Sequence, residues 1–257
     1  MKQRRQYDLR GKTALVTGAS GALGSAFAHD LAQCGATVVL TGRSMDALRP
    51  VAERIAGGGG VAHAVAMDVL DETSVHAAFE QIAALGLLAD IVVCNAGVAT
   101  TRAALDLTID DWNRVVGTNL TGCWLVSREA GRRLVTAGRP GSIIQISSIL
   151  GHRVSGAVMP YAVAKAGLEQ MTRCLALEWA RYGIRVNALA PGYVETPMNR
   201  GFFETPQGQT LLHRIPMRRL GRTEDLRSPL LLLASDESAF MTGSTLVVDG
   251  GHLQSTL

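Results

Sequence analysis

Short apolar runs alternate with helix-like segments along almost the whole chain. Runs that we interpret as strands lie at 12–18, 36–42, 61–69, 89–97, 141–148, 184–192 and 245–251. Runs this apolar are buried on both faces, which is typical of parallel strands. Segments that we interpret as helices separate them, at 22–35, 44–56, 71–85, 109–135 (one or two helices), 161–183 and near 223–235.

This alternation predicts one α/β domain over residues 1–257. We expect a doubly wound parallel sheet of about seven strands, with right-handed crossovers and helices on both faces. The stretch 193–222 shows neither pattern, and we expect it to be irregular. A (β/α) barrel would show the same alternation, but the turn that follows the first strand argues against it.

That turn reads TGASGALG, residues 17–24, and places Gly18, Gly21 and Gly24 between a strand and a helix. A turn of this kind brings backbone N–H groups and a helix N-terminus onto a pyrophosphate. Close helix packing alone could also require glycines. The position after the first strand of an alternating chain favours the dinucleotide interpretation, which makes this a Rossmann fold.

The end of the second strand bears on the choice of cofactor. Dinucleotide folds that prefer NAD usually have an acid there, which bonds the ribose 2′-hydroxyl. Here Gly42 takes that position and Arg43 follows it. No carboxylate would repel a 2′-phosphate, and a guanidinium could pair with it. We therefore expect NADP(H) rather than NAD(H), although Arg43 could simply be an exposed arginine.

The composition argues against several classes of protein. The net charge is +3 and the basic residues are spread out, so we expect no nucleic-acid partner. No run approaches the ~18 apolar residues of a membrane span, and the N-terminus lacks the apolar stretch of a secretory signal. The cysteines lack metal or disulfide spacing, so we expect no metal site and free, mostly buried thiols in the cytoplasm: Cys34, Cys94, Cys123 and Cys174.

The stretch YAVAKAG, residues 161–167, suggests acid–base chemistry. Tyr161 and Lys165 lie four residues apart, on one face of the predicted helix. A phenol has a pKa near ~10, too high for a base at neutral pH. A nearby ammonium stabilises the phenolate and lowers that pKa, so the pair could exchange a proton with an alcohol or a carbonyl. The same spacing also arises by chance.

With these motifs, the chain resembles the short-chain dehydrogenase/reductase family over about residues 7–251. The family's loop, Thr-Gly-x-x-x-Gly-x-Gly, matches at Thr17, Gly18 and Gly24, but Ala22 replaces the middle glycine. The resemblance implies cofactor contacts from a set of loop and strand-end residues: Gly18, Ser20, Gly21, Leu23, Gly24, Arg43, Asp68, Val69, Asn95, Ala96, Gly97, Tyr161, Lys165, Pro191, Gly192, Val194 and Thr196.

The resemblance also implies a catalytic set. The family's serine lies thirteen residues before its tyrosine, which selects Ser148 rather than Ser147. Ser148 would position the substrate oxygen, Tyr161 would be the general acid/base, and Lys165 would lower the tyrosine pKa and hold the ribose hydroxyls. Asn119 would hold a water of a proton relay, or would simply be a buried amide that bonds the backbone at a helix bend. The implied reaction is nicotinamide-dependent hydride transfer between a secondary alcohol and a ketone.

The substrate is expected to lie between residues 149–160 and a flap at about 193–215. Candidate contacts are His152, Met159, Tyr193 and Phe202, with Met198 also on the flap. His152 could instead face water, and the Phe202–Phe203 pair could pack the flap onto its own core.

The scaffold looks most like the gluconate 5-dehydrogenase-type branch of the family, with 3-oxoacyl-carrier-protein reductases second. Because kinship of fold determines substrate poorly, a small or aryl ketone stays open beside a sugar acid. A non-catalytic dinucleotide sensor is disfavoured, since Ser148, Tyr161 and Lys165 are all present. The last strand resembles the one that packs in the family's tetramer interface, so we expect a homotetramer.

Overall fold

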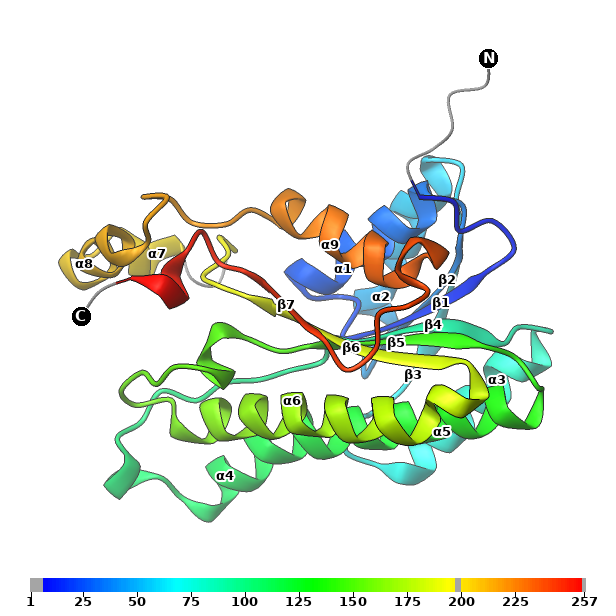
Figure 1. Cartoon of the computed structure of the whole chain (residues 1–257), viewed down its shortest axis with the longest axis horizontal. Helices are drawn as coiled ribbons and strands as arrows, with labels where there is room; N and C mark the ends of the chain where they lie inside the picture. Colours follow the sequence, from blue (N-terminus) through cyan, green and yellow to red (C-terminus); the bar gives the residue numbers. More distant parts are fainter. Residues whose placement is uncertain (1–6, 197–199, 256–257) are drawn as a thin grey trace.

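One parallel sheet organises the computed structural model, which describes residues 7–196 and 200–255 (Figure 1). Within these residues the strands lie in the order β3-β2-β1-β4-β5-β6-β7 and every neighbouring pair is parallel. Their bounds are β1 (Thr13–Thr17), β2 (Thr37–Gly42), β3 (Val61–Ala66), β4 (Ala89–Cys94), β5 (Gly141–Ile146), β6 (Ile184–Pro191) and β7 (Thr245–Val248). The chain order reverses between β1 and β4, which confirms a doubly wound sheet.

Helices cover both faces of this sheet (Figure 1). One face carries α1 (Ala22–Gln33), α2 (Met45–Gly57) and α9 (Arg227–Ala234). The other carries α3 (Glu72–Ala84), α4 (Ile109–Val116), α5 (Gly122–Thr136) and α6 (Met159–Trp179). An apolar core fills each interface between helices and sheet, the first around Phe27 and Leu31 and the second around Phe79 and Leu168. The predicted single-domain Rossmann fold is confirmed, and the barrel is excluded.

The helices begin where side chains can satisfy their first N–H groups. Ser44 accepts a hydrogen bond from the Ala47 N–H and so caps α2, and Asp71 caps α3 in the same way through Thr73. The stretch 109–135 proves to be two helices, because a π-helical turn, Gly117–Thr121, separates α4 from α5. Within the described residues, no helix is long and apolar enough to cross a membrane.

The prediction of an irregular stretch at 193–222 is wrong in part. It contains two short helices, α7 (Arg200–Phe203) and α8 (Pro206–Arg214). Thr205 caps α8 by accepting a hydrogen bond from the Gly208 N–H, and Pro206 takes the first helical position. Both helices lie at one end of the molecule, beside the C-terminal segment (Figure 1). They are too short to show a strong periodicity in the sequence.

Candidate active site

The candidate site lies at the carboxyl ends of the strands, beside the reversal between β1 and β4. The hydroxyl of Thr17 accepts hydrogen bonds from the backbone N–H groups of Asn95 and Ala96, both at 2.9 Å. The Asn95 amide donates to the carbonyl oxygens of Thr17, at 2.9 Å, and of Gly18, at 3.3 Å. Hydrogen bonds thus join the turns after β1 and β4 at the carboxyl ends of the strands, where open parallel sheets bind their ligands.

The turn between β1 and α1 forms a cradle that side chains would fill. A Cβ on Gly24 would lie 2.3 Å from the Gly18 carbonyl oxygen, and one on Gly18, whose φ is +62°, would lie 2.9 Å from the Ala96 Cα. Gly21 precedes α1 without a side-chain cap, which leaves the first N–H groups of the helix for a ligand. This cradle fits the pyrophosphate of a dinucleotide.

Gly21 itself is not required by close contact, because a Cβ there would meet its nearest atom at an ordinary 3.4 Å. Ala22 opens α1 and is exposed. The departure from the family's loop at Ala22 therefore falls at the exposed start of a helix, while the two glycines in tightest contact, Gly18 and Gly24, match it. Ser20 is exposed on the same turn, and Leu23 is half-buried in the first turn of α1.

The residues predicted to contact the cofactor after β2 and β3 differ in exposure and in their hydrogen bonds. Arg43 is exposed, and its guanidinium makes no hydrogen bond or ion pair with any part of the chain that the structure describes. Asp68 bonds locally, since its carboxylate accepts a hydrogen bond from the Leu70 N–H at 3.0 Å. Val69 is buried against Gly122, where a Cβ would lie 2.8 Å from the valine side chain.

The structure brings Tyr161 and Lys165 together on α6. Lys165 is only 3% exposed, and its Nζ donates to the carbonyl oxygen of Ile146 at 2.7 Å. The same Nζ lies 5.5 Å from the centroid of the half-buried Tyr161 ring. The two side chains that the sequence pairs by their spacing are therefore neighbours in the structure.

Ser148 is buried directly after β5, in a segment that packs against α6. Its Oγ accepts a hydrogen bond from the Leu150 N–H at 3.2 Å. Among the described residues the Ser148 hydroxyl acts only as an acceptor, which leaves its proton available to a substrate oxygen. The three polar groups of the predicted reaction therefore come from two elements: Ser148 from the end of β5, and Tyr161 and Lys165 from α6.

Asn119 is fully buried in the π-helical turn and fastens the segment after β4. Its amide nitrogen donates to the Val98 carbonyl oxygen at 2.6 Å, and its amide oxygen accepts from the Val98 N–H at 3.0 Å. A Cβ on Gly97 would lie 2.6 Å from the same amide oxygen. These contacts match the buried-amide alternative for the side chain. The water of a proton relay stays a prediction.

The wall after β6 continues the same edge of the sheet. Pro191 ends β6, and the N–H of Gly192 donates to the Val248 carbonyl oxygen at 2.9 Å. A Cβ on Gly192 would lie 2.8 Å from the Asp249 Cα, so only glycine fits there. Val194 is buried and Thr196 is half-buried. Met198 lies outside the described residues.

Aromatic rings form the part of the flap that reaches the site. Burial raises the pKa of Tyr193, a hydrogen bond with Ser155 opposes this shift, and the neighbouring Tyr161 adds to it. The Tyr193 ring packs edge-on against the ring of the buried Phe203, with 5.8 Å between the ring centroids. It also packs, at a tilt, against the His252 ring, with 5.6 Å between the centroids. Phe202 is exposed, and its ring centroid lies 5.1 Å from that of Phe203. Phe203 thus packs the flap onto its own core.

His152 is exposed, as expected for a histidine that faces water, and it also contacts a buried acid. Its Nε2 lies 3.1 Å from the carboxylate of Glu169, which is buried on α6 one turn beyond Lys165. The signal for this acid in the sequence is its four-residue spacing from Lys165, which places both side chains on one face of α6. The remaining predicted substrate contact, Met159, opens α6 and is exposed.

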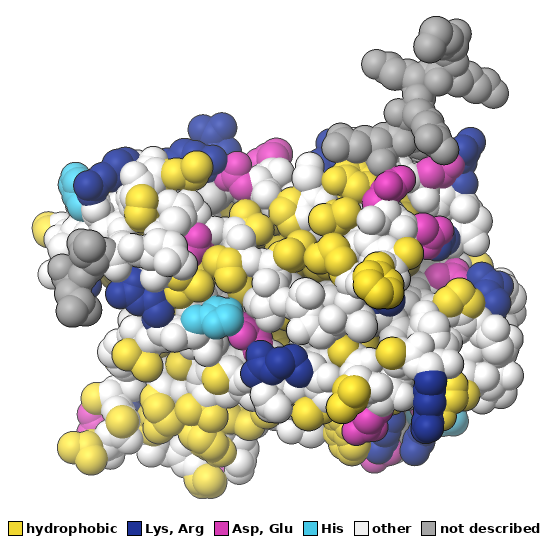
Figure 2. Space-filling view, in the orientation of Figure 1, with side chains coloured by type: hydrophobic (Ala, Val, Ile, Leu, Met, Phe, Trp, Pro, Cys, Tyr) yellow, Lys and Arg dark blue, Asp and Glu magenta, His cyan; other side chains and the backbone are white. Residues whose placement is uncertain are grey.

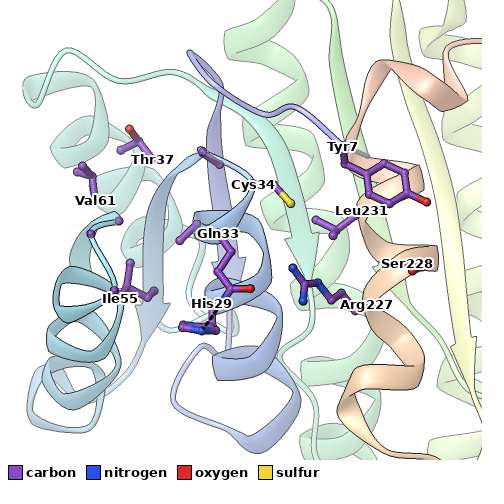
Figure 3. Close-up of a pocket in the computed structure, with 16 residues that line it drawn as sticks. Tyr7, His29, Gln33, Cys34, Thr37, Ile55, Val61, Arg227, Ser228 and Leu231 are labelled. Carbon is purple, nitrogen blue, oxygen red and sulfur yellow. Dashed lines mark hydrogen bonds between the residues drawn. The ribbon is translucent and has the colours of Figure 1, made fainter. Parts of the chain in front are cut away.

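A separate pocket of about 730 Å³ lies at the opposite, amino-terminal edge of the sheet (Figure 3). Its walls are the ends of α1 and α2, the start of β2 and the start of α9, and two of its polar side chains, His29 and Gln33, bond each other at 2.9 Å. Because parallel sheets of this kind use the carboxyl ends of their strands, we place the chemistry at the other edge. No cluster of potential metal ligands occurs in the described residues.

Comparison with known proteins agrees with this geometry. A family model described as enoyl-(acyl carrier protein) reductase matches residues 18–252. A 3-oxoacyl-[acyl-carrier-protein] reductase FabG from Aquifex aeolicus is 39% identical over 247 residues, covering 96% of this chain and 99% of that one.

Two solved structures superimpose closely. A protein from Agrobacterium tumefaciens described as a gluconate dehydrogenase has a TM-score of 0.94 at 37% identity, covering 97% of this chain and 98% of its own. A gluconate 5-dehydrogenase from Burkholderia cenocepacia, in complex with NADP and tartrate, has a TM-score of 0.93 at 33% identity, with the same coverage of 97% and 98%. The chain therefore belongs to the short-chain dehydrogenase/reductase family and is an NAD(P)-dependent oxidoreductase.

Proposed function

We propose that the protein interconverts a secondary alcohol and a ketone, with Tyr161 as the general acid/base. The observation that carries this proposal is the buried ammonium of Lys165, held 5.5 Å from the centroid of the Tyr161 ring by its bond to a backbone carbonyl. A structural lysine would have no need of burial beside a phenol, because removing an ammonium from water is costly.

When bound, a nicotinamide dinucleotide would supply the hydride chemistry of both directions of the reaction. During reduction, the Tyr161 hydroxyl donates its proton to the carbonyl oxygen of the substrate. During oxidation, the Tyr161 phenolate accepts the proton of the alcohol. Ser148 donates a hydrogen bond to the same substrate oxygen and stabilises the charge that develops there. Lys165 stabilises the phenolate and, by resemblance, holds the ribose hydroxyls, while Asn119 extends the proton relay through a water.

The cofactor is proposed to be NADP(H) in preference to NAD(H). Arg43 is exposed at the end of β2, where its guanidinium can pair with a 2′-phosphate. Gly42 offers no carboxylate that would repel this phosphate. The relative from Burkholderia cenocepacia that binds NADP has the same fold over nearly its whole length.

A sugar acid of the gluconate/5-ketogluconate type is the substrate that we favour, held between residues 149–160 and the flap at 193–215. Beside Tyr193, burial and the nearby guanidinium groups of Arg153 and Arg214 lower the pKa of His252, and the carboxylate of Asp249 opposes them. Two cationic side chains and one acid therefore lie near this wall. Basic side chains also gather over the end of the molecule that carries α7 and α8 (Figure 2). A carboxylate would be attracted to this end.

We further propose a cytoplasmic homotetramer. Of the four free cysteines, three are buried, as in proteins of a reducing compartment. Leu177 and Phe240 are almost fully exposed, and Val247 on β7 is 41% exposed. Large apolar side chains in such positions are typical of contacts between subunits.

A panel of alcohols and ketones, followed at the nicotinamide absorbance, tests the proposal. Gluconate with NADP⁺ or 5-ketogluconate with NADPH should give the highest kcat/KM, above a 3-oxoacyl thioester and above aryl ketones. Preference for the thioester would assign the alternative, a 3-oxoacyl-carrier-protein reductase. Cofactor binding without turnover of any of these compounds would indicate a dinucleotide sensor.

A further inference from the structure

A buried carboxylate lies directly behind the predicted catalytic residues. Glu169 is 3% exposed on α6, four residues beyond Lys165. One carboxylate oxygen accepts a hydrogen bond from the Ser147 hydroxyl at 2.8 Å, and the other lies 3.1 Å from the His152 Nε2. Ser147 and His152 bracket Ser148 and the short helical turn that follows it. Both ends of this segment are therefore bound to one side chain of α6.

The middle of the segment is pressed against the same carboxylate. A Cβ on Gly151 would lie 2.7 Å from the Glu169 Oε1 and 3.2 Å from the Lys165 carbonyl oxygen. On the far side, the guanidinium of Arg153 donates to the His252 carbonyl oxygen at 2.8 Å and to the Ser255 hydroxyl at 3.0 Å. The segment is thus fixed from two directions, and its contact with α6 is made around Glu169.

Stability alone does not account for this acid. Removing a carboxylate from water is costly, and an apolar side chain of similar volume at a buried site is often neutral or stabilising. A charged group with both oxygens bonded does give one defined geometry, because each bond restricts the distance and the direction of its partner. The geometry fixed here is that of the Ser148 segment relative to the helix that carries Tyr161 and Lys165.

We propose that Glu169 is a positioning residue for the reaction. By accepting from Ser147 and pairing with His152, its carboxylate holds the Ser148 hydroxyl in register with the Tyr161 phenol across the substrate oxygen. This inference rests on the proposed function, because it requires Ser148 and Tyr161 to act on the same oxygen.

Two substitutions separate geometry from charge. Glu169→Gln keeps the shape and can bond both partners, through its amide oxygen to Ser147 and its amide nitrogen to a neutral His152, so kcat should stay within about threefold of the parent. Glu169→Met keeps the volume but makes neither bond. Since a misplacement of about 1 Å can lower a rate 10²-fold, we expect kcat to fall about 10- to 100-fold, with the dissociation constant of the dinucleotide unchanged.

The matched control is Thr172→Val, further along the same helix. Thr172 is equally buried, but its hydroxyl donates only to the Leu168 carbonyl oxygen of α6 itself. This variant should leave kcat within about twofold of the parent. If Glu169→Met does not fold, Ser147→Ala and His152→Ala each remove one of the two bonds, and each should lower kcat without changing dinucleotide affinity.

A double-mutant cycle with Ser148→Ala decides between positioning and a general structural role. If Glu169 acts through Ser148, Glu169→Met should lower kcat by less than about threefold in the Ser148→Ala background. Equal losses of kcat in the two backgrounds, or a fall in thermal stability with kcat intact, would overturn the proposal. Full activity of Ser148→Ala on its own would instead refute the proposed function.

Discussion

Substituting Gly24 by alanine tests the dinucleotide cradle directly. The new Cβ would lie 2.3 Å from the Gly18 carbonyl oxygen, 2.8 Å from the Asn95 Nδ2 and 2.9 Å from the Ala19 Cα. Ordinary contact begins near 3.4 Å, so the turn has to move by about 1 Å relative to α1. Two of the three atoms belong to the backbone, which cannot move aside as a flexible side chain can.

The loss of stability follows from two contributions. Overpacking of a close contact costs about 1–3 kcal/mol. Displacement of Asn95 also weakens its hydrogen bonds to the carbonyl oxygens of Thr17 and Gly18, each worth about 1 kcal/mol. Together we expect a loss of about 3 kcal/mol, or a decrease in Tm of about 6–12 °C for a chain of this size. The dinucleotide should bind at least tenfold more weakly, because the displaced turn carries its phosphate contacts.

Gly57→Ala is the matched control. Gly57 ends α2, and a Cβ there would meet no atom within 4 Å. Alanine at such a position stabilises by about 0.4–1 kcal/mol, chiefly through the unfolded state. Urea unfolding at one protein concentration and titration of the dinucleotide by fluorescence measure both effects. Unfolding of Gly24→Ala within about 0.5 kcal/mol of the parent, with unchanged dinucleotide affinity, would refute the assigned cradle.

Three further predictions concern the cofactor, the reaction and the pH dependence of stability. Tyr161→Phe should lower kcat by at least about 10²-fold while the dissociation constant of the dinucleotide changes little, and near-normal turnover would contradict the assigned general acid/base. Arg43→Ala should weaken NADPH binding about 5- to 10-fold and leave NADH binding unchanged, as measured by parallel titrations. A hydrogen bond from Arg219, with a second from the Arg222 N–H, lowers the pKa of Asp225 from 3.8 to about 2. The lowered value stabilises the fold above pH 3.8, and this contribution is lost as the pH falls towards 2. Asp225→Asn should therefore unfold at lower urea than the parent at pH 7, with a difference that shrinks below about pH 4.

Elements with strong periodicity were predictable from the sequence, because their pattern is local. The seven strands and the long helices follow from apolar runs and caps, and their observed ends differ by a few residues, as at β3, which ends at Ala66 rather than at 69. The short helices α7 and α8 were missed. They have only four and nine residues, too few for a periodic pattern, and are stabilised by a cap at Thr205 and by the contact of Phe203 with Tyr193, which lies outside both helices.

In the candidate site, too, local relationships could be predicted from the sequence and contacts between different elements could not. Tyr161 and Lys165 could be paired from their spacing, because one helix sets the distance between them. The contacts of Asn119 and His152 could not be predicted, because their partners lie on other elements: Val98 after β4 and Glu169 on α6. The role of Arg43 is inferred from its exposed position at the end of β2.

The spacing of residues in the sequence does not determine the geometry of the site, because polar groups behind the reacting residues set their positions. Lys165 is directed to the phenol by the Ile146 carbonyl oxygen, at the end of β5. The serine segment is held to α6 by Glu169, and the segment after β4 is held to the π-helical turn by Asn119. Each of these bonds joins a strand end to a helix, so its geometry exists only once the sheet has assembled. A change in any one of them should therefore alter the relative positions of groups that the sequence places correctly, and should reduce kcat before it reduces dinucleotide binding.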